Sequence, residues 1–576
     1  MDPSSVNNLL GLLRSNELYR DDKLDKAVIN NVVYYTARVR SETQLNALIN
    51  SLFNSHKWDT LDILDLHDMS KGIFYWKLHI SEPVIPLDQF YQVWDNCFRS
   101  CQSWTLPKLA IICGALETYD QFLLFQSSNF IDDSGKVVKM YKRWRHDLFL
   151  PIWCGFIQRN LGKNPNDLRS LVLLYSTIYR YSDNNFRDIP WELITTPILN
   201  IFYEYVSIEP TVDTFLDRNI NKIVKLLQSS IPHCNEQLLS AVLNKYCKIC
   251  HDLSTKELNF ITQNKDYSRR YYSNILLSIV LSLKGLLESN SNIPIQWFHQ
   301  ILICLYYINF IAHDFGTVGF ESYEYILQVS IMGLMMSSKK KPNVYTETIG
   351  MMQINIWINL DYQNKVNDCK LLFFLNFLEL TIPQFDSISI QFLTQVIEPL
   401  FILYKESPSK EIREQTHSMI LSAMNTSLLD WQGKFLPDYF KLSLNQYLSG
   451  MLSEAQIVLI SQSLASRIEV LQNAQIKLGD IIEDIYSLIR SMNSKVSSII
   501  LETLIKCLIF QVPTSSELDL QSWLENILEL IINTDLLDKP NQSALLLTLW
   551  DVITVMKSET ALRWWYNTQE RIQGKL

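Results

Sequence analysis

The chain has 576 residues, of which 47% are hydrophobic, and its formal net charge is −9. This length exceeds the usual size of one compact core, so we expect either several domains or one extended body of repeats. The only dense basic run that we recognise is Lys339–Lys341. Nucleic-acid binding gains affinity when many lysines and arginines displace counterions from the phosphates, and so short a run would contribute little. We therefore expect no nucleic-acid partner.

Residues that break helices are scarce, because the chain has only 15 glycines and 18 prolines, about half of their average usage. The 10 cysteines lie between Cys97 and Cys507, and no positively charged and apolar leader opens the chain. These features favour reduced thiols over a disulfide framework.

The first 130 residues are predicted to form an N-terminal helical region. A helical pattern runs over 22–35, and Ser41 followed by Gln44 predicts a capping box at the start of the next helix. The aromatic stretch 74–80 has the composition of a strand, but no hairpin partner follows it, so we predict a helix. The apolar spacing over 87–101 predicts another amphipathic helix.

A polar loop over 130–135 is the first candidate domain boundary. Beyond it, apolar-periodic runs of helical length alternate with short polar breaks, as over 167–181, 237–253, 271–287, 391–404, 456–471 and 545–556. Stacked antiparallel helix pairs of about 40 residues give this rhythm in HEAT and armadillo proteins. We predict an all-α fold, an α-solenoid with a helical-repeat body over 136–557, and an irregular helical bundle is the alternative.

The most lipid-like segment is Ile301–Ala312. A helix of about 12 residues spans only about 18 Å of a hydrocarbon layer about 30 Å thick, so we predict a buried core helix instead of a membrane span. Peripheral attachment to a membrane stays possible. Gly316 and Gly319 lack the spacing of a dinucleotide fingerprint, and we interpret them as the end of a helix over 297–313, with a restart at Ser322.

Cys247-Lys248-Ile249-Cys250-His251 has the residue spacing of a c-type haem attachment motif. His233-Cys234 lies nearby in the sequence, so a zinc site is the other possible interpretation. One apolar helical face contains both motif cysteines, which favours buried thiols; this face comprises Leu239, Val242, Leu243, Tyr246, Cys247, Cys250 and Leu253.

No catalytic motif is recognised. The 9 histidines are scattered, and we find neither a nucleophile elbow nor a phosphate-binding loop. We therefore predict no catalytic residue, no cofactor and no metal. An enzyme with a site assembled from distant residues is a further alternative.

The last three residues, Gly574, Lys575 and Leu576, approximate the small-basic-leucine address that the peroxisomal import receptor recognises. The receptor would hold the terminal carboxylate with amide and cationic donors and bind Leu576 in an apolar slot. Glycine in place of the usual serine removes a hydroxyl and adds backbone entropy, so we expect a weaker signal.

A final helix over 558–570 is predicted to hold the targeting tail 571–576 in an accessible position. Trp564 and Trp565 would pack this helix on the preceding one, while the polar residues after it project. Arg571 adds a cation that an acidic receptor groove would favour.

Stretches along the whole chain resemble the fungal peroxin-8 family, and their sequences are similar to those of a yeast member. These stretches are Asn31–Tyr35, Arg38–Ser41, Trp76–Leu78, Ser81–Pro83, Phe90–Trp94, Phe130–Asp132, Gly316–Phe320, Ser322–Tyr325, Ile397–Leu400 and Trp564–Tyr566.

The resemblance implies a non-enzymatic peroxisome-biogenesis factor, peripheral on the matrix face of the peroxisomal membrane. Members of the family bind the import receptor for C-terminal signals, help cargo to leave it, and link the docking complex to the RING-finger complex. Some relatives also have an N-terminal signal, but the segments that begin at Lys23, Arg38 and Lys77 do not fit its pattern. The alternative is a cytoplasmic or nuclear helical-repeat scaffold with a fortuitous C-terminal Gly-Lys-Leu.

Overall fold

The computed structural model contains helices and no β-strand in the part of the chain that it describes, so the all-α prediction is confirmed. The described residues are 3–15, 22–82, 84–128, 135–160, 164–180, 183, 188–207, 215–259, 265–289, 293–315, 321–339, 341–358, 364–385, 388–473, 481–492, 497–533 and 537–573.

Contacts between helices divide the chain into two compact units, Met1–Leu334 and Met335–Leu576. The border falls within α16 (Glu321–Ser338). The predicted boundary at 130–135 lies outside the described residues except for Gly135, and the limits 1–130 and 136–557 stay predictions.

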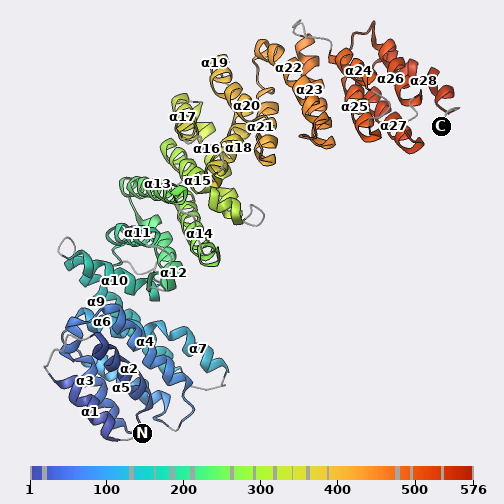
Figure 1. The fold of residues 1–576 in the computed structure, drawn as a ribbon. Helices are drawn as coiled ribbons and strands as arrows, with labels where there is room; N and C mark the ends of the chain where they lie inside the picture. The colour runs from blue at the N-terminus through green and yellow to red at the C-terminus, as the bar shows by residue number, and fades with distance from the viewer. Residues whose placement is uncertain are drawn as a thin grey trace. The chain divides into compact units, whose positions relative to one another are not determined.

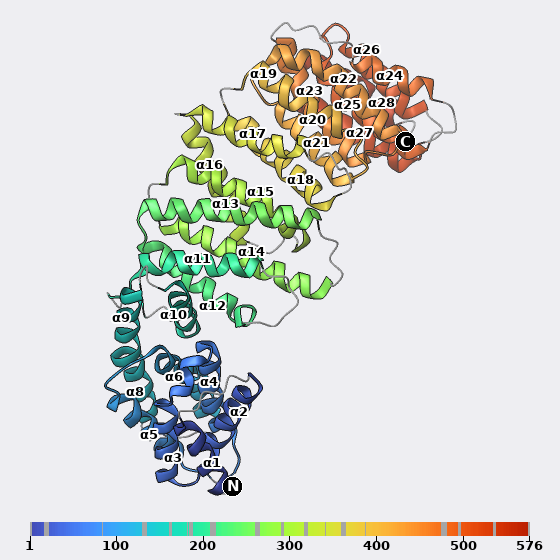
Figure 2. The same ribbon diagram turned by 60° about the vertical axis from the view of Figure 1, so that its left-hand side comes forward.

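In the first unit, several helices pack against the second helix before them and the second helix after them in the chain. Its helices before α16 are α1 (Pro3–Arg14), α2 (Asp22–Arg38), α3 (Glu42–Phe53), α4 (Ile63–His79), α5 (Leu87–Ser100), α6 (Leu106–Glu117), α7 (Tyr119–Ser128), α8 (Lys136–Arg143), α9 (Leu150–Asn160), α10 (Pro165–Ile178), α11 (Trp191–Ser207), α12 (Phe215–Ser230), α13 (Glu236–Asn259), α14 (Lys265–Ser289) and α15 (Ile295–Phe315). Helix α3 packs against α1 and α5, α4 against α2 and α6, and α13 against α11 and α15 (Figures 1 and 2).

The second unit shows the same succession. Its helices after α16 are α17 (Pro342–Ile358), α18 (Lys365–Thr381), α19 (Ile390–Phe392), α20 (Glu398–Tyr404), α21 (Lys410–Ala423), α22 (Leu429–Leu448), α23 (Glu454–Asn473), α24 (Ile481–Ser491), α25 (Ser498–Gln511), α26 (Leu520–Asn533), α27 (Lys539–Met556) and α28 (Glu559–Gln573). Helices α18, α21, α23, α25 and α27 pack each against the next. Stacked pairs and an irregular bundle both allow such contacts, so the solenoid stays a prediction.

Aromatic side chains form the core of the N-terminal helices. The stretch predicted as helix over 74–80 belongs to α4 up to His79, and its Phe74 ring lies 5.2 Å from Trp94 of α5. Helix α6 approaches α4 closely at Gly114, where a Cβ atom would lie 2.2 Å from the carbonyl oxygen of His67. Only glycine permits this approach without displacement of the backbone.

The predicted capping box at the start of α3 is wrong. Ser41 is the N-cap residue, but its side chain caps no backbone N–H, and its hydroxyl instead lies 2.8 Å from the Thr43 hydroxyl. A neighbouring hydroxyl competes here with the backbone amides for the serine oxygen.

Among the described residues, two segments have π-helical geometry, η2 (Trp144–Phe149) and η6 (Leu393–Ile397). A proline lies two positions after the end of each segment, Pro151 after η2 and Pro399 after η6. Proline cannot donate to the carbonyl four residues earlier and its ring clashes with that carbonyl, so the preceding turn adopts wider hydrogen bonding.

Helix α15 contains the apolar segment discussed above. It has 21 residues, so the predicted 12-residue length was too short and length by itself does not exclude a membrane span. Within the described part of the chain it is the one helix long and apolar enough to cross a membrane, yet 78% of its apolar window is buried. This burial agrees with the predicted core helix.

Candidate functional site

The C-terminal helix α28 is held by two neighbours. The ring of Trp565 lies 5.3 Å from that of Trp550 in α27, as predicted for the preceding helix. Trp564 instead faces α26, where its Nε1 donates to Glu525 Oε1 at 2.9 Å. Arg571 Nη1 lies 3.2 Å from Glu525 Oε2.

These contacts correct the predicted tail. Helix α28 ends at Gln573, so Arg571 belongs to the helix, and its exposed side chain pairs with Glu525. The targeting residues Gly574, Lys575 and Leu576 lie outside the described residues, directly after this helix.

The cysteine motif lies on α13. Its predicted apolar face is buried at Leu239, Val242, Leu243, Tyr246, Cys250 and Leu253 and half-buried at Cys247. Cys247 Sγ lies 3.4 Å from Cys304 Sγ of α15, and the hydrogen bond with the Cys304 thiol, together with burial, raises the pKa of Cys247 above its ordinary value. The motif therefore contributes thiols to helix packing.

His251 and His233 point to other partners. The ring of His251 meets the edge of Tyr307, and His233 stacks on Trp191 at 5.0 Å. Among the described residues, no group of three or more His, Cys, Asp or Glu side chains could hold a metal ion.

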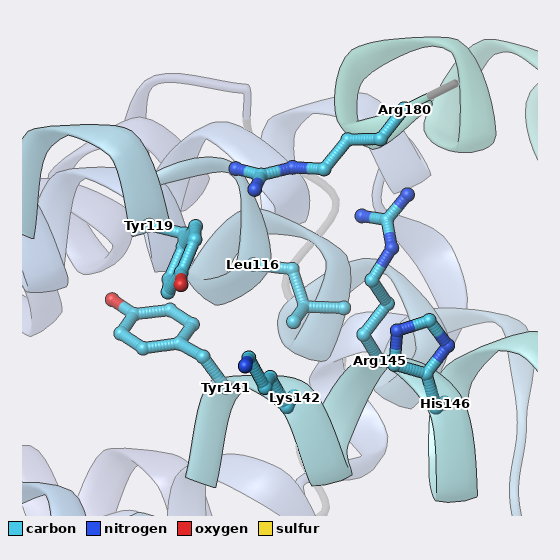
Figure 3. A pocket seen from close by; sticks show the side chains of 7 residues that line it. All are labelled: Leu116, Tyr119, Tyr141, Lys142, Arg145, His146 and Arg180. Atoms are coloured by element: carbon cyan, nitrogen blue, oxygen red, sulfur yellow. The ribbon is translucent and has the colours of Figure 1, made fainter. Parts of the chain in front are cut away.

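A basic pocket of about 130 Å³ opens in the first unit, where α6, α7, α8, η2 and the segment after α10 meet. Its lining residues are Leu116, Tyr119, Tyr141, Lys142, Arg145, His146 and Arg180. Figure 3 shows the guanidinium groups of Arg145 and Arg180 turned toward the same space, with Tyr119 and Leu116 beside it.

The base of this pocket is rigidly built. Arg145 is buried, and its Nε donates to Asp183 Oδ1 at 3.1 Å while its Nη2 donates to Asp183 Oδ2. The carboxylate also accepts from the Tyr175 hydroxyl at 3.2 Å and from the Arg180 backbone N–H at 3.2 Å. Asp183 is thus saturated and orients Arg145.

Sequence reasoning missed this pocket, because its residues come from four helical segments and the stretch after α10. One signal was available, however: Lys136–His146 is a longer stretch than Lys339–Lys341 and holds more basic residues, namely Lys136, Lys139, Lys142, Arg143, Arg145 and His146. The search for dense basic runs overlooked this stretch, because apolar and aromatic residues separate its cations.

A buried charge cluster lies at the junction of α4 and α6. His67 Nε2 lies 3.0 Å from Glu117 Oε2, and Glu117 Oε1 accepts from Lys71 at 2.8 Å and from Lys222 at 2.5 Å. Burial disfavours the imidazolium, but Asp68, Cys113 and Glu117 outweigh it and hold the pKa of His67 well above 6.5. Burial likewise opposes the Glu117 carboxylate, but His67 and the two lysines hold its pKa well below 4.5.

Comparison with known proteins gives consistent matches. The family model described as the PEX8 helical domain matches residues 208–322, and the PEX8 C-terminal domain matches residues 430–575. Peroxisomal biogenesis factor 8 of Saccharomyces cerevisiae is 30% identical over 582 residues, which cover 95% of each chain.

Among solved structures, the crystal complex of SYS-1/POP-1 includes a chain that is 11% identical. The match covers 92% of this chain and 86% of that chain with a TM-score of 0.30, too low to support any argument. The sequence likeness over nearly the whole length, with two domain matches, confirms the resemblance found in the sequence: the chain belongs to the peroxisomal biogenesis factor 8 (PEX8) family.

Proposed function

We propose that this protein is a non-enzymatic factor of peroxisomal matrix-protein import. The observation that supports this proposal is the 30% identity to peroxisomal biogenesis factor 8 over 95% of both chains. Gly574, Lys575 and Leu576, which follow α28, are the proposed contact with the import receptor for C-terminal signals.

The helical body has the proposed role of a scaffold. It would lie peripherally on the matrix face of the peroxisomal membrane, link the docking complex to the RING-finger complex, and promote cargo release. Competition between the tail and cargo for one receptor pocket offers a simple release mechanism. Because the tail is a weak variant, such competition needs a high local concentration, which attachment to the same complex supplies.

Receptor binding is tested with the full chain and purified receptor. Removal of Gly574–Leu576 should weaken binding, whereas Gly574→Ser should strengthen it by restoring a hydroxyl. Binding that neither change alters would contradict the proposed contact. A cargo-displacement titration then measures how well the full chain, the truncated chain and the Gly574→Ser variant each release cargo from the receptor. Cargo release by the truncated chain at the same concentration as the full chain would exclude competition.

Location is tested with a fluorescent protein fused to the N terminus, which leaves Leu576 free. Punctate peroxisomal fluorescence that depends on the last three residues is expected. Diffuse cytoplasmic or nuclear fluorescence would instead favour the alternative of a helical scaffold with a fortuitous Gly-Lys-Leu end.

A further inference from the structure

The basic pocket of the first unit carries more positive charge than its neighbours neutralise. Asp183 pairs with Arg145, and Asp120 lies 2.5 Å from Arg180. Lys142 and His146 make no hydrogen bond or ion pair within the described residues. In a chain with a net charge of −9, this pocket is lined by cations, and none of its described lining residues is acidic.

Asp183 and Asp120 offset the charges of the two guanidinium groups that face this space, so its surplus positive charge comes from Lys142, which pairs with no described residue. Asp183 fixes Arg145 from behind through Nε and Nη2, which leaves Nη1 without a hydrogen bond to any described residue. Arg180 lies 4.5 Å from the Tyr119 ring centroid, so that ring holds its guanidinium at the pocket. Both arginines are therefore positioned by other groups before any ligand arrives, which lowers the entropic cost of binding.

The helix geometry adds a second observation. Arg145 and His146 belong to the π-helical segment η2, directly after Tyr141 and Lys142 of α8. Segments of this kind are uncommon and occur frequently at functional sites. The wide turn places Lys142, Arg145 and His146 around one pocket (Figure 3).

The size of the pocket selects a small group. At about 130 Å³ it is well below the roughly 300–1,000 Å³ of pockets that enclose drug-sized ligands. It has room for roughly four waters at about 30 Å³ each, hence for one tetrahedral anion. Donors from Lys142, Arg145, Arg180 and the Tyr119 hydroxyl surround this space and match the several oxygens of a phosphate better than the two of a carboxylate.

We propose that this pocket binds a phosphate group, held by Arg145, Arg180 and Lys142. The phosphate belongs either to a small soluble molecule or to a lipid headgroup that presents a phosphomonoester. Exposed Leu123 and Leu124 on α7, the helix that begins with Tyr119, would enter the lipid in the second case. The site is independent of the proposed contact between the C-terminal tail and the receptor.

The test uses the full chain and two probes, inorganic phosphate and vesicles that contain phosphatidic acid. Lys142→Glu reverses an exposed charge in the wall without touching the buried Arg145–Asp183 pair, so the fold should persist. The matched control is Lys136→Glu, an exposed lysine of the same helix outside the pocket. Circular dichroism melting checks that both variants fold as the wild type does.

We expect Lys142→Glu to weaken binding at least about tenfold, because it removes a charged hydrogen bond to the phosphate. Lys136→Glu should change binding less than about twofold, because it alters a surface charge distant from the pocket. Phosphate binding in solution supports a soluble ligand, and binding only to phosphatidic acid vesicles supports the lipid headgroup. Absence of both would overturn the proposal. Equal losses in the two variants, or equal binding to phosphatidylserine vesicles, would also overturn it, because diffuse charge attraction would then explain the binding.

Discussion

At the scale of single residues, the cluster of His67, Glu117, Lys71 and Lys222 joins segments that are distant in the sequence. Its hydrogen bonds connect α4 to α6 and α6 to α12, with Thr177 of α10 3.3 Å from His67 Nε2. Buried ion pairs depend on every partner, since removal of one leaves an uncompensated charge.

The Glu117→Gln variant should lose about 3 kcal/mol of stability, with a definite dependence on pH. The pKa of Glu117 is lowered, so its contribution is fully present above about 4.5 and is lost as pH falls. The pKa of His67 is raised, so its contribution is fully present below 6.5 and is lost as pH rises through the raised value. The difference between wild type and variant should thus be greatest between about pH 4.5 and 6.5.

Urea unfolding of both proteins across pH 4 to 9 measures this difference, because pH effects from other groups cancel in it. Glu288→Gln is the control, since Glu288 forms a solvent-accessible pair with Lys284 one turn earlier in the same helix. Parallel stability profiles for wild type and Glu117→Gln would contradict the role assigned to the cluster.

Gly114 gives a second residue-scale prediction. Gly114→Ala should destabilise the first unit by about 1–3 kcal/mol, because the added Cβ meets backbone atoms of α4 that cannot yield cheaply. Gly155→Ala in α9 has nothing within 4 Å of its new Cβ, so it should be neutral or stabilising by about 0.5–1 kcal/mol. Thermal melting of the two variants provides the comparison, and equal effects would refute the close approach of α6 to α4.

At the scale of helices, Glu525 of α26 organises the C-terminal end, since it accepts from Trp564 and pairs with Arg571. Glu525→Ala should increase hydrogen exchange in α28, because Trp564 Nε1 and Arg571 both lose their partner. Glu529→Ala, an exposed carboxylate one turn later in the same helix, is the matched control. Unchanged exchange after Glu525→Ala would show that the tryptophan packing suffices to hold α28.

For the molecule as a whole, the division into two compact units leads us to expect unfolding in more than one cooperative transition. Calorimetry should resolve two transitions, one lowered by Gly114→Ala in the first unit and the other by Leu549→Ala in the core of the second. Leu549 is fully buried, so its truncation should cost about 2–5 kcal/mol. One transition that both substitutions shift would show that the units unfold together.

Apolar periodicity and the scarcity of glycine and proline are local properties of the chain, so the amino-acid sequence predicted the helical class and many of the helices. It identified helix 74–80, the buried cysteine face of α13 and the family. Only tertiary structure decided the rest. The pairing of Arg571 with Glu525, the Glu117 cluster and the pocket of Arg145 and Arg180 each join residues 35 or more positions apart. Side chains so distant meet only when helices pack, and no local pattern records which faces will come together.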